Sequence, residues 1–336
     1  MLSHIIPRDE KGRIDKNIFV IAEEIVIKSA SIGGALPKPI IDEVRLLQQK
    51  INTNALMQLN SIHVSAQQFF YLDHCYLKKE SKNFHEQQVQ LYYDFQDMNN
   101  VLYQDNKFII NFDLLDSIYN SFEQNRYVEM RYDNSSSLSF FLPSSKAYQL
   151  IYVFAIYYFL LWCGYKSSTS IIILDAMLKI ILPQYGLWYI AQGFKQSYHE
   201  YFKQIKDLNM ESPEGFKSFL ELAMPLALHE IEAIKKNLNS EYLCRELIQY
   251  INMTRFEEMF SPFPKYSELI TKELLLHGEI KRGEVKEIIN KEQRTSTQLI
   301  RDLIDLEYIK SDSPKGVIRL NFPLEIAQFI FQDVFK

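Results

Sequence analysis

The feature that most constrains the fold is an uncharged run of 19 residues from Ala147 to Tyr165. A helix of that length is long enough to cross a bilayer. The run is interrupted by polar side chains, namely Tyr148, Gln149, Tyr152, Tyr157 and Tyr158. These make a hydrocarbon span unfavourable, and a helix that is apolar all round is otherwise buried in protein. The run therefore predicts a central core helix, and we expect no membrane association.

The supply of turn residues favours helices over strands. The 336 residues include only 10 glycines and 11 prolines, which is few for a many-stranded protein. Apolar residues recur at helical spacing in several segments, notably 18–30, 171–182 and 215–238. The segment from Tyr127 to Leu142 instead alternates around a polar turn, which predicts a short hairpin or flap. We therefore expect a mainly α-helical protein with a short β-hairpin.

Charge and cysteine content indicate an ordinary protein of a reducing compartment. The net charge of −5 does not indicate a chain-wide binder of nucleic acid. Three cysteines, Cys75, Cys163 and Cys244, lie far apart, which is typical of free thiols, and no closely spaced His/Cys set predicts a structural metal. The first 16 residues are charged and lack the apolar core of a secretory signal. We expect a cytoplasmic location.

A compact module follows Pro262 and Pro264, two prolines that a helix interior cannot hold and that mark the expected domain boundary. Its expected elements are helices over 266–276, 282–289 and 295–306, followed by strands over 308–311 and 317–320. The residues Asp312 to Gly316 form the turn between the strands. Three helices followed by a two-stranded wing form the winged helix-turn-helix plan, whose third helix can enter the major groove of DNA.

The candidate DNA-binding residues of this module lie on the third helix and on the wing. They are Arg294, Thr295, Ser296, Thr297, Gln298, Arg301, Lys315 and Arg319. However, the segment 278–321 has nine Lys or Arg against eight Asp or Glu, whereas DNA affinity comes largely from neutralising phosphates. Two interpretations stay open: DNA binding, and a winged helix used for packing or protein contact.

Ordered motifs in this module and upstream of it carry a resemblance to a known family. In the module they are 274–279, 282–285, 294–295, 311–316, 319–320 and 322–323. Upstream they are 30–36, 44–45, 160–162, 175–178 and 185–188. With these motifs the chain resembles a bacterial branch of the Fic family. The resemblance implies an N-terminal helical region (1–105), a Fic-type helical core (106–260) and a C-terminal winged-helix domain (264–336).

The resemblance implies an activity whose catalytic residues are missing here. Active Fic proteins transfer AMP from ATP to a hydroxyl of a target protein through an HPFxxGNGR-type loop. That loop supplies a general base, an acidic metal ligand, an arginine for phosphate oxygens and backbone N–H groups that cradle phosphates. Between Trp162 and Asp175 this chain reads CGYKSSTSIIIL, without histidine, acidic residue or arginine. Only Gly164 and Lys166 remain as candidate nucleotide contacts, and no catalytic residue or metal ligand carries over.

Other histidines do not replace the missing base. The pairs His199–Glu200 and His229–Glu230 are adjacent in sequence, and adjacent residues on a helix do not face each other. Many family members also carry an inhibitory S/TxxxE(G/N) helix motif, and the matching stretch here, 52–57, has no glutamate. An enzyme that cannot transfer AMP needs no internal inhibitor, so the two losses agree.

The sequence therefore predicts a non-catalytic Fic-like protein without a cofactor, acting as a regulatory or interaction protein. The partners considered are DNA, a protein partner and a second copy of the chain. The alternative is an active nucleotide-binding protein adenylyltransferase (an AMPylator) or nucleotidyltransferase with a divergent loop, which would need ATP and Mg²⁺.

Overall fold

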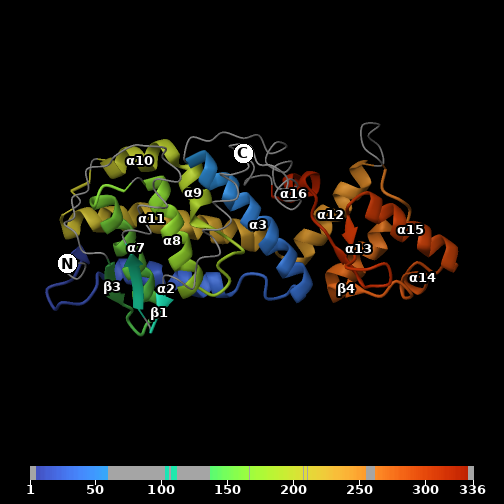
Figure 1. Cartoon of the computed structure of the whole chain (residues 1–336), viewed down its shortest axis with the longest axis horizontal. Coiled ribbons are helices and arrows are strands. Elements are labelled where there is room, and N and C mark those ends of the chain that lie inside the picture. Colours follow the sequence, from blue (N-terminus) through green and yellow to red (C-terminus); the bar gives the residue numbers. More distant parts are fainter. Residues whose placement is uncertain are drawn as a thin grey trace. The chain divides into compact units, whose positions relative to one another are not determined.

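The computed structural model describes residues 5–59, 103–105, 107–111, 137–165, 167–206, 208–209, 211–254 and 262–331. The protein is mainly α-helical with short antiparallel strands, as the sequence predicts (Figure 1). Its packing forms two compact units. Unit 1 comprises Met1–Ala30 and Asn52–Glu232, and unit 2 comprises Ser31–Ile51 and Ala233–Lys336. Both α3 (Lys38–Leu59) and α11 (Pro213–Asn237) contribute residues to each unit.

Unit 1 is organised around α7 (Lys146–Trp162), which packs against its neighbours α2 and α8. Its other helices are α2 (Lys16–Ala30), α8 (Ser167–Ile181), α9 (Ile190–Gln196) and α10 (Tyr198–Lys206). Twelve of the 17 residues of α7 are buried, which confirms the predicted core helix. Within the described part of the chain, no helix combines the length and the apolar character that a membrane crossing requires.

Aromatic side chains fill the centre of unit 1. Tyr157 of α7 lies with its ring centroid 5.7 Å from that of Phe219 in α11 and 6.2 Å from that of Phe194 in α9. Phe194 in turn stacks on Tyr201 of α10, with centroids 4.2 Å apart. Each such ring pair adds about 0.5–1.5 kcal/mol beyond the burial of its area. These aromatic residues therefore belong to the core and offer no surface for stacking bases.

A small antiparallel sheet of order β1-β2-β3 belongs to unit 1. Its strands are β1 (Tyr103–Gln104), β2 (Lys107–Asn111) and β3 (Ser137–Phe141). The register pairs Ile109 of β2 with Ser139 of β3. The second strand of the predicted flap is thus present as β3, and it pairs with β2. The first half of that flap, 127–136, lies outside the described residues.

Unit 2 combines a helical part with a second antiparallel sheet of order β4-β6-β5. Its helices, besides the first part of α3, are α12 (Ser240–Thr254), α13 (Ser267–His277), α14 (Val285–Ile288), α15 (Gln293–Asp305) and α16 (Leu324–Ile330). Its strands are β4 (Glu279–Ile280), β5 (Ile309–Lys310) and β6 (Ile318–Leu320). The three helices and two strands expected after Pro264 are all present, with α14 shorter than expected. Strand β4, between the first two of those helices, was not expected.

The core of unit 2 contains one buried polar pair. Tyr308, which precedes β5, is fully buried, and its hydroxyl lies 2.7 Å from the hydroxyl of Thr271 in α13. Phe263 packs edge-on against the Tyr308 ring, with centroids 4.9 Å apart. The hydrogen bond satisfies two polar groups that would otherwise be costly to bury, and it ties α13 to the sheet.

We predict that Gly278→Ala destabilises unit 2. Gly278 caps α13 at a φ of 80°, and a Cβ there would lie 2.8 Å from Pro37 Cβ and 2.8 Å from Pro39 Cδ. Steric crowding and an unfavourable φ together should cost about 1–3 kcal/mol, measured as a lower denaturation midpoint in urea. Gly283→Ala is the matched control, since a Cβ there meets nothing within 4 Å. Equal midpoints for the two variants would contradict this packing.

Candidate functional site

The junction between α7 and α8 is where the resemblance places a catalytic loop, and here it is a helix-terminating turn. Gly164 adopts a φ of 99°. Its N–H donates to the Leu161 carbonyl at 3.1 Å, and the Tyr165 N–H donates to the Leu160 carbonyl at 3.1 Å. This pair of bonds is the Schellman motif, in which a glycine in the left-handed region closes a helix. The N–H groups of Gly164 and Tyr165 are therefore used to close α7.

The remaining groups at this junction offer little chemistry. Cys163 is fully buried, and burial raises the pKa of its thiol to about 12, so the reactive thiolate is not formed at neutral pH. Lys166, the other candidate nucleotide contact, lies outside the described residues. The prediction that Gly164 and Lys166 contact a nucleotide stays a prediction, while the Gly164 N–H already has a backbone partner.

A buried polar cluster joins two segments that the resemblance singles out. Asn52, in the stretch that matches the inhibitory motif, donates from Nδ2 to an Asp175 carboxylate oxygen at 2.9 Å. The Tyr185 hydroxyl donates to the other oxygen of the same carboxylate. Asp175 is only 4% exposed. The cluster thus connects α3, α8 and the segment before α9 within unit 1.

Burial decides the charge state of this cluster. It raises the pKa of Asp175 to about 7, although the hydrogen bonds from Tyr185 and Asn52 and the charge of Lys179 all act to lower it. A carboxyl with a pKa near neutrality is a familiar general acid or base. The cavity beside it, lined by Leu56, Tyr189 and α8 residues, has a volume of about 10 Å³. That is room for one water molecule, so this cluster is a structural element of the core.

A second buried carboxyl lies between α11 and α9. Glu230 is 6% exposed, and burial raises its pKa to about 7 against the opposing charge of Lys195. The amide of the neighbouring buried Gln192 has no hydrogen-bond partner. His229 and Glu230 are adjacent on α11, and adjacent residues on a helix do not face each other. The side chain of His199 lies outside the described residues.

No metal centre is visible in the described ranges. Among these residues, no group of three or more His, Cys, Asp or Glu side chains is placed to hold a metal ion. The free thiols described are Cys163 and Cys244.

The third helix of the C-terminal module, α15, presents three candidate side chains on one exposed stripe. Arg294, Gln298 and Arg301 are spaced four and three residues apart and therefore share a face of the helix. All three are exposed. Gln298 donates from Nε2 to the Asp302 carboxylate at 2.6 Å, which holds its side chain along the helix surface. This stripe is exposed along one face of α15.

Two further candidates on α15 are turned to the helix itself. Ser296 is fully buried, and its hydroxyl donates to the Gln293 carbonyl at 2.9 Å. The Thr297 hydroxyl donates to the same carbonyl at 2.8 Å. Ser296 therefore belongs to the packed face of α15 and cannot reach a base edge, because it shares that face with Ile300 and Leu303. Thr295 and Thr297 are both exposed.

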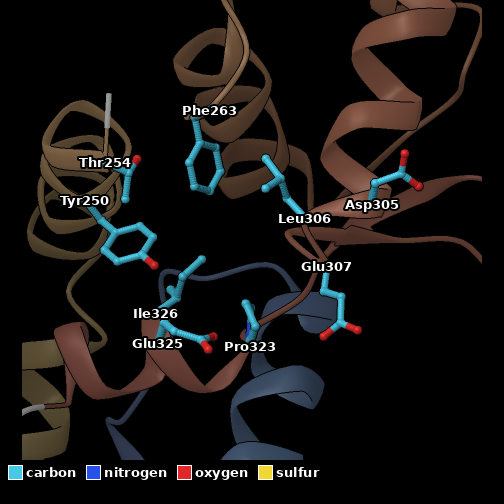
Figure 2. A pocket seen from close by; sticks show the side chains of 9 residues that line it. All are labelled: Tyr250, Thr254, Phe263, Asp305, Leu306, Glu307, Pro323, Glu325 and Ile326. Atoms are coloured by element: carbon cyan, nitrogen blue, oxygen red, sulfur yellow. The ribbon is translucent and has the colours of Figure 1, made fainter. Parts of the chain in front are cut away.

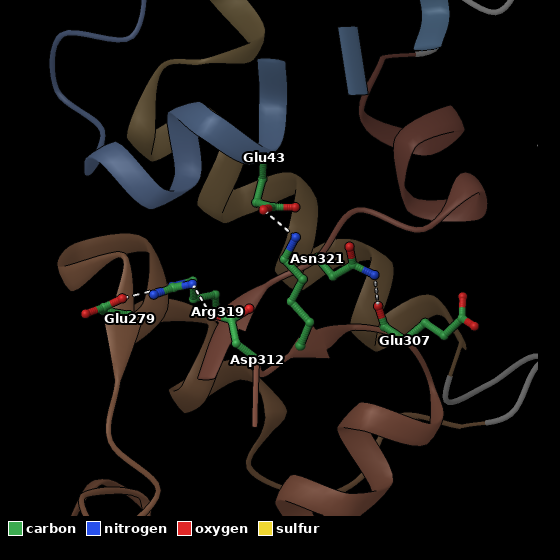
Figure 3. Close-up of polar contacts among 7 residues, drawn as sticks. Glu43, Glu279, Glu307, Asp312, Arg319 and Asn321 are labelled. Atoms are coloured by element: carbon green, nitrogen blue, oxygen red, sulfur yellow. Dashed lines mark hydrogen bonds and ion pairs between the residues drawn. The ribbon is translucent and has the colours of Figure 1, made fainter. Parts of the chain in front are cut away.

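On β6, Arg319 is engaged in two ion pairs (Figure 3). Its Nε donates to Glu279 of β4 at 2.9 Å, and its Nη1 donates to Asp312 in the turn before β6 at 2.8 Å. Both acidic partners offset its charge, so Arg319 holds β4, β6 and this turn together. Lys310 of β5 is likewise paired, 2.5 Å from the Glu43 carboxylate. Lys315, at the tip of the turn, is exposed.

The comparisons with known proteins find one kind of likeness. No protein-family model matches the sequence, and no curated protein matches it. Among solved structures, the chain is similar to a Fic family protein from Desulfovibrio desulfuricans G20, at 11% identity and a TM-score of 0.42. The aligned region covers 91% of this chain and 95% of that chain. At this identity and TM-score the likeness assigns no role to any residue of the chain.

We predict that the free energy of unfolding falls as pH rises, because Asp175 must then ionise in a buried position. Its folded-state pKa of about 7 exceeds the usual aspartate value of 3.8, so between these pH values the folded protein holds a proton that the unfolded chain releases. Its stabilising contribution is full below pH 4 and is lost as pH rises towards 7. Relative to Asp175→Asn, the unfolding free energy of the wild type should fall by about 2–4 kcal/mol from pH 4.5 to pH 7.5 in urea titrations.

Asp15→Asn provides a control, because the contribution of Asp15 to stability depends on pH in the opposite direction. The hydrogen bond from Lys217 lowers the pKa of Asp15, so its contribution is present above the unfolded pKa and is lost as pH falls. The difference in unfolding free energy between the wild type and Asp175→Asn is the decisive quantity. If it did not change with pH, Asp175 would not be held protonated in the folded protein.

Proposed function

We propose that this chain is a non-catalytic, Fic-like protein that acts by binding, and that the segment from α13 to β6 is a winged helix that contacts DNA. The observation that carries the first half is the α7–α8 junction. The resemblance implies that this loop should hold a base, a metal-binding acid, an arginine and free backbone N–H groups. The sequence lacks the three side chains, and the Schellman turn occupies the N–H groups of Gly164 and Tyr165.

Support for a winged helix comes from the order and pairing of the elements. The chain runs α13, β4, α14, α15, β5, β6, and the sheet has the order β4-β6-β5 with antiparallel pairs. In winged helices the helix before the wing is the one that reads the major groove. That position is held here by α15, and the turn 312–316 between β5 and β6 corresponds to the wing.

The exposed charges favour weak, strongly salt-dependent binding. Within the described residues, Arg294, Arg301 and Lys315 are exposed and have no ion-pair partner, whereas Arg319 and Lys310 are paired. Three phosphate contacts give a slope of log K against log salt of about −3. Asp305 lies on the same face as Arg301, one turn further along α15, so the basic stripe is confined to the N-terminal part of the helix.

We predict that the full chain binds duplex DNA at low salt through α15. The double variant Arg294→Ala, Arg301→Ala should bind about tenfold or more weakly and should lower the salt slope by about 2, because two phosphate contacts are lost. Fluorescence anisotropy with labelled duplexes at several salt concentrations measures both quantities. A pool of random duplexes, followed by selection, tests whether any sequence is preferred.

Arg245→Ala is the matched control for charge. Arg245 is exposed on α12 and pairs with Glu246, away from the proposed recognition helix. Its removal should leave DNA binding within about twofold. No binding at the lowest salt, or equal losses in the control and the double variant, would exclude α15 as a DNA-reading helix and leave protein contact as its function.

We further predict that the protein neither transfers AMP nor is stabilised by ATP. Incubation of the full chain with ATP labelled at the α-phosphate, Mg²⁺ and a cell lysate should label no protein, because the sequence between Trp162 and Asp175 holds no histidine or acidic residue that could activate a hydroxyl or bind Mg²⁺. The melting temperature should not change when ATP and Mg²⁺ are added.

The role of Gly164 can be separated from ligand binding. Gly164→Ala should lower the unfolding free energy by about 1–2 kcal/mol without ATP present, because alanine disfavours a φ of 99°. Gly34→Ala is the control, since a Cβ there meets no atom closer than 3.9 Å. Protein labelling that Gly164→Ala abolishes while the apo-protein keeps its stability would instead establish the divergent adenylyltransferase.

A further inference from the structure

Unit 2 contains a pocket that the proposed DNA surface does not use. It has a volume of about 350 Å³ and lies between α12, α16 and the residues that end α15 (Figure 2). Its inner wall is apolar and aromatic, formed mainly by Tyr250, Phe263 and Ile326. Its rim carries three carboxylates, Asp305, Glu307 and Glu325, and none of the described residues that line it is basic. The volume is near the lower end of that found for small-ligand sites.

A polar group inside the pocket has no partner. Tyr250 is only 7% exposed, and its hydroxyl makes no hydrogen bond to any described residue. Figure 2 shows the hydroxyl directed into the space between Phe263 and the acidic rim. Burial raises the pKa of Tyr250, and the charge of Glu325 raises it further, so the hydroxyl keeps its proton. The hydroxyl oxygen is not among the fully buried polar atoms that lack a partner, so it is accessible from the pocket and can bond to a ligand.

The aromatic wall is a packed group of rings. The rings of Tyr250 and Phe263 meet edge to face, with centroids 6.0 Å apart and an interplanar angle of 82°. Tyr250 also packs against Phe329, and Phe263 packs against Tyr308. A cation over a ring face that these contacts leave open gains about 0.5–2 kcal/mol. The same wall gives apolar surface for the methylene groups of such a ligand.

The acidic rim is held in place by the backbone. Glu307 has a φ of 54° and closes α15, with its N–H donating to the Ile304 carbonyl at 2.8 Å. Asn321 donates from Nδ2 to the Glu307 carbonyl at 2.7 Å, as Figure 3 shows. The C-terminal end of α15 also carries the negative end of the helix dipole. These features all favour a positive charge at the mouth of the pocket.

The arrangement excludes two other ligand classes. A bound metal ion needs converging donors, and among the described residues no three acidic, His or Cys side chains converge. A nucleotide or other anion would face three carboxylates, with no counter-charge among the described lining residues. A cation of several atoms, with an apolar stem, fits both the separated carboxylates and the aromatic wall.

From these contacts we infer that the pocket binds an alkylammonium or alkylguanidinium group, with its stem against Tyr250 and Phe263 and its charge at Glu307 and Glu325. Two sources supply this chemistry: a free small amine, and a Lys or Arg side chain of a peptide. The inference does not depend on DNA binding by α15 or on the state of the α7–α8 junction.

Calorimetry with the full chain tests the site and separates its sources. The probes are agmatine and cadaverine as free cations, and an acetylated, amidated Gly-Arg-Gly peptide as the side-chain form. We expect millimolar binding of at least one probe, with affinity reduced about tenfold by Glu325→Gln and about threefold by Tyr250→Phe. Binding of the free amines alone assigns the site to a small molecule, and binding of the peptide assigns it to a basic segment.

The control variant is Glu287→Gln, which removes the same charge from exposed α14 in the same unit. It should bind the probes as the wild type does. If Glu325→Gln fails to fold, Glu307→Gln replaces it, with the same tenfold loss expected. Absence of binding throughout the millimolar range, equal loss in the control, or comparable binding of the anion glutarate would overturn the inference.

Discussion

The structure of unit 1 depends on one constraint: α7 has almost no polar face that could be exposed to solvent. Such a helix must be covered on nearly every side, and α2, α8 and the aromatic residues of α9, α10 and α11 cover it. The same helix must then stop abruptly so that α8 can pack beside it. Gly164 provides that stop through its left-handed backbone. The need to end α7 beside α8 therefore decides the hydrogen bonds of this turn.

Much of this fold could be predicted because the responsible signals are local. An uncharged run predicted α7, and glycine after an apolar stretch predicted the end of α13 at Gly278. Strand β4 was missed because its two residues show no periodicity, and it exists only through pairing with β6, about forty residues later in the chain. The pairing of β2 with β3 is equally non-local. Such pairings stabilise the folded chain but leave no pattern in the sequence of either strand.

The candidate site residues show the same difference between local signals, which could be predicted, and non-local contacts, which could not. Ser296 could have been recognised as buried, since its spacing of four and seven residues from Ile300 and Leu303 places it on the apolar face of α15. The pairing of Arg319 with Glu279 could not, because the two residues are far apart in sequence. The environment of Asp175 was also hidden, as Asn52 and Tyr185 approach it from separate segments. Local periodicity thus identifies faces of helices, while charge states and ion pairs require the assembled core.

At one residue at the end of α15, the backbone conformation and the charge of the pocket rim favour different amino acids. Glu307 adopts a backbone conformation that costs most L-amino acids about 1–2 kcal/mol and that glycine adopts freely. Glycine would relieve the strain, yet it would also remove a carboxylate from the rim of the unit 2 pocket. Selection for a more stable chain and selection for a negatively charged rim would therefore drive this position towards different amino acids.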